Sequence, residues 1–235
     1  AQITFETTAT RTAASYTPAY YEDVQMIFWD EKIKNAGKAQ VVDLIADRVN
    51  ELRQDLIDTL CTALFTTNTP GTYDMTPLPY IIDTGNTIGG IAVADAANWA
   101  AAVEDTTTTQ LLLFGSGSLA YAMNTATHGT HKPTLHLTTP NLFSKFMSVA
   151  VGAQYYRDEA TAKLGFENLV FLDAPVVADA YMTAAMWLGI DMDSFDIRVP
   201  SGSNNGIEIT EWMDMTPSGY INTAGKFATW VGQVC

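Results

Sequence analysis

The sequence has few charges, few cysteines and no long apolar run. Charged residues make up 16% of its 235 residues, and its two cysteines are Cys61 and Cys235. Cysteines this far apart form neither a disulfide framework nor a metal-ligand spacing, which predicts reduced thiols in a cytoplasm, although Cys235 could also pair between chains. No apolar run approaches the roughly 20 residues that a membrane helix needs. No secretory signal is visible, and the start at Ala1 suggests that an upstream segment was removed or left out.

Basic residues are scarce as well. The chain has 12 Lys and Arg against 26 Asp and Glu, a net charge of -14, and its cations are scattered singly. This distribution excludes a basic stripe for phosphate contacts, so the chain does not grip any nucleic acid that lies near it. Low charge together with 47% hydrophobic and 11% aromatic residues indicates that much of the surface is covered by another molecule. We therefore expect an oligomer.

Two strands are expected near the start of the chain. Residues 2–8 alternate as a half-buried strand does, and residues 23–30 place Val24, Met26 and Phe28 opposite Ile27 and Trp29. The segment between them is polar and aromatic and shows no helical period. A loop of this length is uncommon in a compact domain unless it has a function. We expect residues 1–34 to form a β-hairpin arm that reaches a neighbouring molecule, with three tyrosines in the contact: Tyr16, Tyr20 and Tyr21.

A long helix is expected over residues 38–65, where apolar residues recur every three or four positions without Gly or Pro. The apolar stripe comprises Val41, Ile45, Val49, Leu52, Leu56, Leu60 and Leu64. Such a helix is about 42 Å long, close to the ~45 Å diameter of a globule of this chain length. An elongated or flat subunit accommodates the helix better than a sphere does.

A second face of this helix carries an acidic ridge: Asp43, Asp47, Glu51 and Asp55. Like charges at four-residue spacing repel each other by a few tenths of a kcal/mol in an isolated helix. Arg48 can relieve Glu51, but Asp43 and Asp47 have no basic residue within one turn. The ridge is either a solvated face or a surface that meets basic groups of a neighbouring subunit.

The remainder of the chain mixes helices and strands irregularly, which predicts the α+β class. Helices are expected near 94–103, over 106–129, where Gly115 and Gly117 interrupt the apolar spacing, and at 141–150 with Asn141 as the N-cap. A hairpin turn is expected at residues 204–206. Strands are expected at 133–140, 169–172, 176–179, 186–190, 197–199, 207–212 and 227–234.

Four groups of residues are candidates for metal, phosphate or catalytic sites. His128, His131 and His136 could supply three imidazoles to zinc, but two lie in a loop and the third alternates with leucines on a strand. Asp191, Asp193 and Asp196 lack the glycine and glutamate of a calcium loop and indicate a turn. Neither Gly115–Ser118 nor Gly85–Gly90 has the sequence of a nucleophile elbow or a phosphate loop.

Asp173 and Asp179 flank a short apolar run and could form the acid–base pair of a hydrolase. Such a pair needs one desolvated carboxylate and a third group within reach, and the sequence offers no obvious third member. The structural alternative is a turn at Asp173-Ala174-Pro175 with Asp179 at the end of a strand. No metal, cofactor or catalytic residue is predicted.

Several segments, in order, resemble a tailed-bacteriophage major capsid protein. They are the helix that begins "GKAQVVDLI", "GNTIGGI", Trp99, "HKPTLHLTTPNLFSKF", "LGFENLVFLDAPVVAD" and "WVGQVC". The resemblance implies the Hong Kong 97 type of fold: residues 1–34 as the extended-loop arm, 35–88 as a peripheral domain with the spine helix, 89–160 as mainly the axial domain, and 161–235 as β-rich return strands shared by both domains.

The same resemblance implies a structural protein rather than an enzyme. It would assemble into the pentamers and hexamers of an icosahedral head in the host cytoplasm and reside in the virion around double-stranded DNA. Portal, scaffolding and decoration proteins would be its other partners. Three alternatives remain open: an encapsulin-like nanocompartment shell, a hydrolase built on the Asp173 and Asp179 pair, and a monomeric binding module of 25.5 kDa.

Overall fold

The computed structural model describes eight ranges of the chain: residues 13–36, 43–94, 100–104, 111–150, 169–182, 185–201, 206–215 and 224–234. Helices and two β-sheets interleave along the chain, which confirms the expected α+β class. The helices are α1 (Trp29–Lys34), α2 (Leu44–Phe65), α3 (Leu78–Ile81), α4 (Leu119–Ala126), α5 (Pro140–Ala150) and the 3-10 turn η3 (Met192–Ser194). The strands are β1 (Ala19–Ile27), β2 (Leu135–Thr138), β3 (Leu169–Phe171), β4 (Ala174–Ala178), β5 (Trp187–Ile190), β6 (Ile197–Arg198), β7 (Ile207–Ile209), β8 (Met213–Asp214) and β9 (Ala224–Val234).

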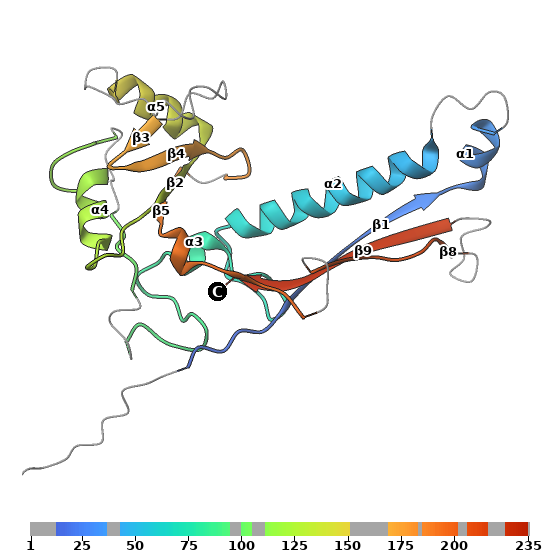
Figure 1. Ribbon diagram of the computed structural model, residues 1–235, viewed down its shortest axis with the longest axis horizontal. Helices are drawn as coiled ribbons and strands as arrows, with labels where there is room; N and C mark the ends of the chain where they lie inside the picture. Colours follow the sequence, from blue (N-terminus) through green and yellow to red (C-terminus); the bar gives the residue numbers. More distant parts are fainter. Residues whose placement is uncertain are drawn as a thin grey trace, which may run out of the picture.

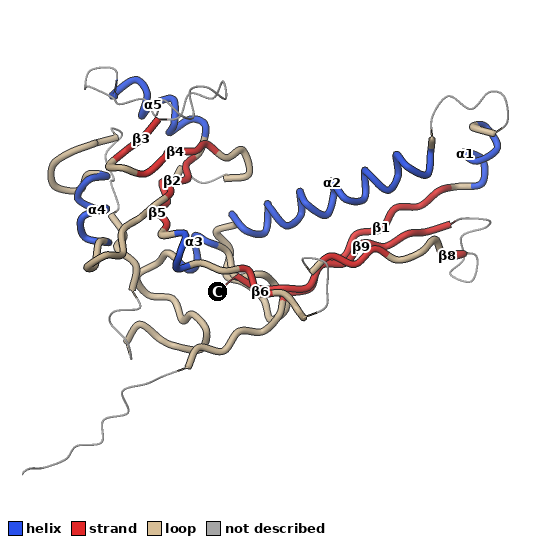
Figure 2. Tube along the Cα trace, viewed as in Figure 1, coloured by secondary structure: helices blue, strands red, loops and turns tan. Residues whose placement is uncertain are grey.

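The molecule is elongated and has two parts (Figure 1). One part, which we call the long arm, consists of α1, α2, β1 and β6–β9, with α1 at its outer end (Figure 1). The other, which we call the β2–β5 module, consists of α4, α5 and the four-stranded sheet. α3 lies where the two parts meet, and long loops connect them (Figure 2). None of the helices in the described ranges is long and apolar enough to cross a membrane.

The sheet of the long arm is organised around β9. β1 pairs with it antiparallel over nine residues, from Ala19↔Gly232 to Ile27↔Ala224, and β6, β7 and β8 pair with it in turn. The expected strand at 23–30 therefore begins earlier and ends at Ile27. It ends there because the Glu31 carboxylate accepts the backbone N–H of Phe28 at 3.3 Å and starts α1. The other expected strand, at 2–8, lies outside the described residues.

α2 packs against this sheet through the predicted apolar stripe. Leu52 and Leu56 are fully buried in a core with Ala19, Ala228 and Trp230, and Leu60 and Leu64 pack beside them. The stripe was wrong at Ile45, which is largely exposed. The helix also begins at Leu44 rather than Lys38: Asp43 is non-helical, and its carboxylate accepts the Ala46 N–H at 3.2 Å. A helix cannot continue back through an N-cap in that conformation.

The sheet of the β2–β5 module has the order β3-β4-β2-β5, in which β2 runs parallel to β4 and the other pairs are antiparallel. The expected strands of this region are confirmed to within two residues. Two helix predictions needed correction. α5 begins at Pro140, and Thr139 caps it by accepting the Leu142 N–H at 3.3 Å, so Asn141 lies inside the helix. α4 starts only after Gly115 and Gly117, whose positive φ angles do not fit a helix.

Other predictions fall on residues outside the described ranges or are not decided by the fold. Residues 100–104 are not helical, and 95–99 are outside the description. Most of the expected turn at 204–206 also lies outside the described residues. The division of the chain into four segments at residues 34, 88 and 160 remains a prediction.

The β3–β4 hairpin turns through Leu172 and Asp173, both with positive φ (48° and 72°). This geometry favours Asn-Gly, and a leucine in the left-handed region is strained by about 1–2 kcal/mol. We expect Leu172→Asn to raise the free energy of unfolding by about 1 kcal/mol in urea titrations. Leu172→Ala is the matched control, because it removes the same exposed apolar surface and keeps the strained backbone. Equal stability of the two variants would contradict this account.

Candidate functional site

The structure separates the two aspartates of the proposed hydrolase pair. Asp173 lies in the turn before β4, exposed, with its carboxylate 3.3 Å from the Lys132 ammonium. Asp179 lies after the other end of β4 and accepts the Tyr181 N–H at 2.8 Å. Six residues of extended chain place them about 20 Å apart. They cannot act on one substrate atom, and both terminate strands; the turn itself comes at Leu172-Asp173, earlier than expected.

The three histidines do not converge either. His128 and His131 are exposed in a tight turn where their backbones pair, and the His131 ring is 3.2 Å from Asp191. His136 is fully buried on β2, and burial lowers its pKa to about 4. Among the described residues, no three His, Cys, Asp or Glu side chains are grouped as metal ligands are.

The aspartates at 191–196 form the predicted turn between β5 and β6. Asp191 caps η3 by accepting the Asp193 N–H at 3.3 Å and the Ser194 hydroxyl at 3.1 Å. Desolvation raises the pKa of Asp191, but its hydrogen bonds with His131, Asp193 and Ser194 outweigh this and leave the pKa below its usual value. Asp196 pairs with Arg198 at 2.7 Å.

Ser118, in the glycine-serine stretch, is likewise structural. It is buried, its hydroxyl donates to the Gly115 carbonyl at 2.7 Å and accepts the Tyr121 N–H at 3.2 Å as the N-cap of α4. A serine with both roles occupied in this way is not poised as a nucleophile.

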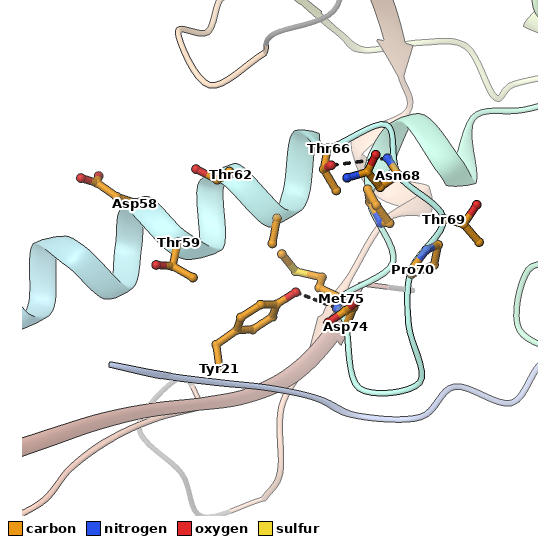
Figure 3. Close-up of a pocket in the computed structure, with 12 residues that line it drawn as sticks. Tyr21, Asp58, Thr59, Thr62, Thr66, Asn68, Thr69, Pro70, Asp74 and Met75 are labelled. Carbon is orange, nitrogen blue, oxygen red and sulfur yellow. Dashed lines mark hydrogen bonds between the residues drawn. The ribbon is translucent and has the colours of Figure 1, made fainter. Parts of the chain in front are cut away.

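A shallow cavity of about 490 Å³ lies beside the second half of α2 (Figure 3). The carboxylates of Asp58 and Asp74 and several threonines line it, and none of the lining residues that the structure describes is cationic. Both carboxylates are engaged: Asp74 accepts the Gly71 N–H at 2.8 Å, and Asp58 accepts the Gln54 amide and the Tyr181 hydroxyl. The hydrogen bond to Asp58 raises the pKa of Tyr181 to about 12. Asp58 therefore ties the long arm to the β4–β5 connection.

The three tyrosines predicted for a subunit contact have different surroundings. Tyr21 points into the arm beneath α2 (Figure 3) and accepts the Met75 N–H at 2.9 Å, and its ring packs at a tilt against that of Trp230, with centroids 6.1 Å apart. Burial is the main cause of its raised pKa. Tyr20 points outward, 57% exposed, against the ring of Tyr73. Tyr16 is half-buried near Gly89. A contact role for all three stays a prediction, and Tyr20 is the member that the fold leaves most accessible.

The acidic ridge on α2 is exposed, and most of its charges have partners within the chain. Asp43 caps the helix, and Asp47 lies in its first turn, where the helix dipole favours a negative charge. Arg48 binds Glu51 at 2.7 Å, as expected from the spacing. The Gln25 amide of β1 donates to Asp55 at 2.8 Å. The self-repulsion expected from the spacing is thus relieved without a neighbouring subunit, whose involvement stays a prediction.

Arg48 makes a second contact that sequence spacing did not predict. Its guanidinium also binds Glu31 of α1 at 3.1 Å, so one cation holds α1 against the first turns of α2. The hydrogen bond that Arg48 donates to Glu51 is the main cause of the raised pKa of Arg48. Both pairs are partly screened by solvent.

We expect Arg48→Met to lower the free energy of unfolding by about 1 kcal/mol, because it leaves two carboxylates side by side. Arg53→Met is the control: Arg53 lies on the same helix and forms no ion pair with a described residue. Urea titrations of both variants measure the effect, and a loss as large for Arg53→Met would show that the bridge contributes nothing specific.

The apolar side of α1 is held outward by this bridge. Trp29 and Ile33, one helical turn apart, are 56% and 53% exposed, and Phe28 beside them is also exposed. We call these three residues the distal apolar face. A second set of exposed apolar side chains lies on the β2–β5 module and on the loop before α4, and includes Leu112, Phe114, Tyr121, Val149, Leu172 and Val177. Large exposed apolar groups at both ends of one chain are typical of subunits that pack against other molecules.

No model of a known protein family matches the chain, and no curated protein matches it either. Solved structures do match. The holo-SrpI encapsulin complex from Synechococcus elongatus PCC 7942 aligns over 94% of this chain and 70% of its own, with a TM-score of 0.56 and 9% identity. The cyanophage A-1(L) capsid aligns over 92% and 73%, with a TM-score of 0.57 and 16% identity.

A structure from Gordonia phage Cozz aligns over 99% of this chain and 72% of its own, with a TM-score of 0.51 and 14% identity. These alignments cover the long arm and the β2–β5 module together. The chain therefore has the Hong Kong 97 type of fold that phage capsid proteins and encapsulins share, as its sequence resemblance implied.

Proposed function

We propose that this chain is the major capsid protein of a tailed phage and builds an icosahedral head around double-stranded DNA. The observation that carries this proposal is the alignment of nearly the whole chain with a cyanophage capsid subunit, at a TM-score of 0.57. The ordered motifs of the sequence support the same assignment. The candidate catalytic residues Asp173, Ser118 and Asp179 form a turn, a helix cap and the end of a strand.

The mechanism of such a protein is geometric. Elongated subunits pack edge to edge as pentamers and hexamers, and each contact between unlike surfaces is weak. A subunit that makes many such contacts at once is nevertheless held firmly, because each contact raises the effective concentration for the next. The distal apolar face at one end and the exposed apolar side chains of the β2–β5 module at the other supply surfaces for these contacts.

The charge of the chain suits a container for DNA. A net charge of -14 with 12 scattered Lys and Arg gives no surface that would hold phosphates. Packaged DNA would then slide along the wall rather than adhere to it. Portal, scaffolding and decoration proteins, the virion location and assembly in the host cytoplasm belong to the same proposal.

A bacterial nanocompartment shell is the second candidate. The alignment with the holo-SrpI encapsulin covers 94% of this chain, which is as extensive as the alignment with the phage capsid. The two functions share the fold and differ in what the shell encloses.

Sedimentation of the purified protein followed by electron microscopy tests both candidates. Closed icosahedral particles or rings of five and six subunits are expected. Double-stranded DNA in particles from producing cells supports the phage head, whereas particles filled with protein support the nanocompartment. A species of 25.5 kDa at every concentration would contradict both shell functions and favour a monomeric binding module.

A further inference from the structure

The β2–β5 module buries a titratable ring at the centre of its sheet. His136 lies on β2 between Val176 of β4 and Gly189 of β5, with no exposed surface. Its Nδ1 atom accepts the indole N–H of Trp187 at 3.0 Å. Its Nε2 atom is also buried and has no partner in regular hydrogen-bond geometry among the described residues, although the backbone of Phe171 is near enough to interact with the ring. A buried polar atom without a partner is rare in a folded protein and requires a physical explanation.

The surroundings of the ring are aromatic. The rings of Phe171 and Trp187 lie 5.8 and 5.5 Å from that of His136, and both also pack on Phe146 of α5. Phe171 and Trp187 are themselves in edge contact at 6.2 Å. Four elements, β2, α5, β3 and β5, each contribute one ring to this group. We call His136, Phe146, Phe171 and Trp187 the aromatic cluster.

The hydrogen bond from Trp187 fixes the neutral form of the ring. Since Nδ1 accepts, the single proton of the neutral imidazole must be on Nε2. A second proton would have to bind Nδ1, at the position toward which the indole N–H already points. Protonation therefore breaks that hydrogen bond and leaves a positive charge among aromatic rings, which is strongly unfavourable without a counter-charge.

No counter-charge is present in the described part of the chain. The groups that face His136 are Phe171 of β3, Val176 of β4, Trp187 and Gly189 of β5, and through the cluster Phe146 of α5. None of them titrates. Burial lowers the pKa of His136 to about 4, and only the backbone of Phe171 opposes the shift.

We propose that His136 is an acid-sensitive lock of the β2–β5 module, whose protonation separates Trp187 from β2 and opens the aromatic cluster. The lock concerns the folding of a single chain, so it stands or fails independently of the proposed shell function. It assigns a role to a histidine that is not grouped with other potential metal ligands among the described residues.

The lock operates on the acidic side of neutrality. In the unfolded chain the ring takes up a proton near its ordinary pKa of 6.5, whereas in the folded chain it does so only near 4. The unfolded state therefore binds more protons than the folded state between pH 6.5 and 4. His136 does not reduce the free energy of unfolding above pH 6.5, and it reduces it progressively as the pH falls toward 4. At pH 5 this residue alone lowers the ratio of folded to unfolded protein about 30-fold relative to pH 7.5.

Urea unfolding at several pH values, compared between the wild type and His136→Asn, tests the lock. Asparagine keeps an acceptor at the position of Nδ1 for Trp187 but cannot take up a proton. Between pH 7.5 and 5 the folding equilibrium constant of the wild type is expected to fall about 30-fold more than that of the variant. His131→Asn, which removes an exposed histidine, is the control and is expected to follow the wild type. Equal pH dependence of the wild type and His136→Asn would overturn the proposal.

A second measurement needs no variant and holds even if His136→Asn does not fold. The pH dependence of deuterium exchange at the C2 position of each histidine in the wild-type protein reports its titration by mass spectrometry. We expect His136 to exchange slowly and to titrate at least one pH unit below the same residue in urea. A midpoint for His136 at or above 6.5 in the folded protein would overturn the lock.

Discussion

Leu56→Ala is expected to lower the free energy of unfolding by about 3 kcal/mol. Leu56 is 1% exposed and lies in the core between α2 and the β1–β9 sheet. Deleting a buried leucine side chain loses its transfer free energy and leaves a cavity, which together cost about 2–5 kcal/mol. Losing about 3 kcal/mol removes much of the 5–15 kcal/mol by which a domain is usually stable.

Ile57→Ala is the matched control for this prediction. Ile57 is the next residue of the same helix, is 46% exposed, and has the same number of side-chain carbons. Surface substitutions of this kind change stability by about 0.5 kcal/mol or less. Urea titrations of the two variants compare burial at nearly constant helix propensity. If Ile57→Ala cost as much as Leu56→Ala, the face of α2 assigned to the core would be wrong.

The double variant Trp29→Ser, Ile33→Ser is expected to raise the concentration needed for assembly at least about 10-fold. Buried aromatic and aliphatic anchors contribute about 2 kcal/mol or more to a protein contact, and their loss weakens that contact about 30-fold. The glutamate–arginine bridge holds α1 in place before assembly, so little ordering is needed when the distal apolar face binds. Light scattering against protein concentration measures the effect.

Two controls separate a lost contact from a lost fold. Lys34→Ser changes an exposed residue of the same helix and leaves the distal apolar face intact. Urea titration of the unassembled double variant should show almost the stability of the wild type, because both side chains are more than half exposed. Unchanged assembly of the double variant would place the distal apolar face outside the subunit contacts.

Local periodicity was sufficient to predict the main elements. The three- and four-residue spacing of apolar groups located α2 and identified Leu52 and Leu56 as core residues, because a helix buries one face. Short segments rich in apolar residues located β2, β4, β5 and β9. Helix starts were less accurate, since Asp43 and Thr139 act as caps through single hydrogen bonds that several nearby residues could equally have made.

Contacts between distant segments were not predictable in this way. Alternation indicates that 19–27 is a strand but not that its partner is 224–234, about 200 residues later. For the same reason, the sequence did not predict the Arg48–Glu31 bridge or the hydrogen bond from Gln25 to Asp55. On β2 the pattern itself was misleading: His136 and Thr138 are the buried residues, and the leucines beside them are only half-buried. Helices and strands cover both faces of β2, so the polarity of a side chain there does not indicate whether it faces the core or the solvent.

The position of β9 has a consequence for synthesis. All four other strands of the arm sheet pair with β9, and it is the last of them to leave the ribosome. Until residues 224–234 are made, β1 has no strand partner among the described residues and α2 has no sheet to cover. An unfinished chain therefore lacks the long arm, whatever its β2–β5 module has achieved. On such a chain the apolar face of α2, with Leu52 and Leu56, stays uncovered by this sheet, so the last strand along the chain also completes the core of the arm.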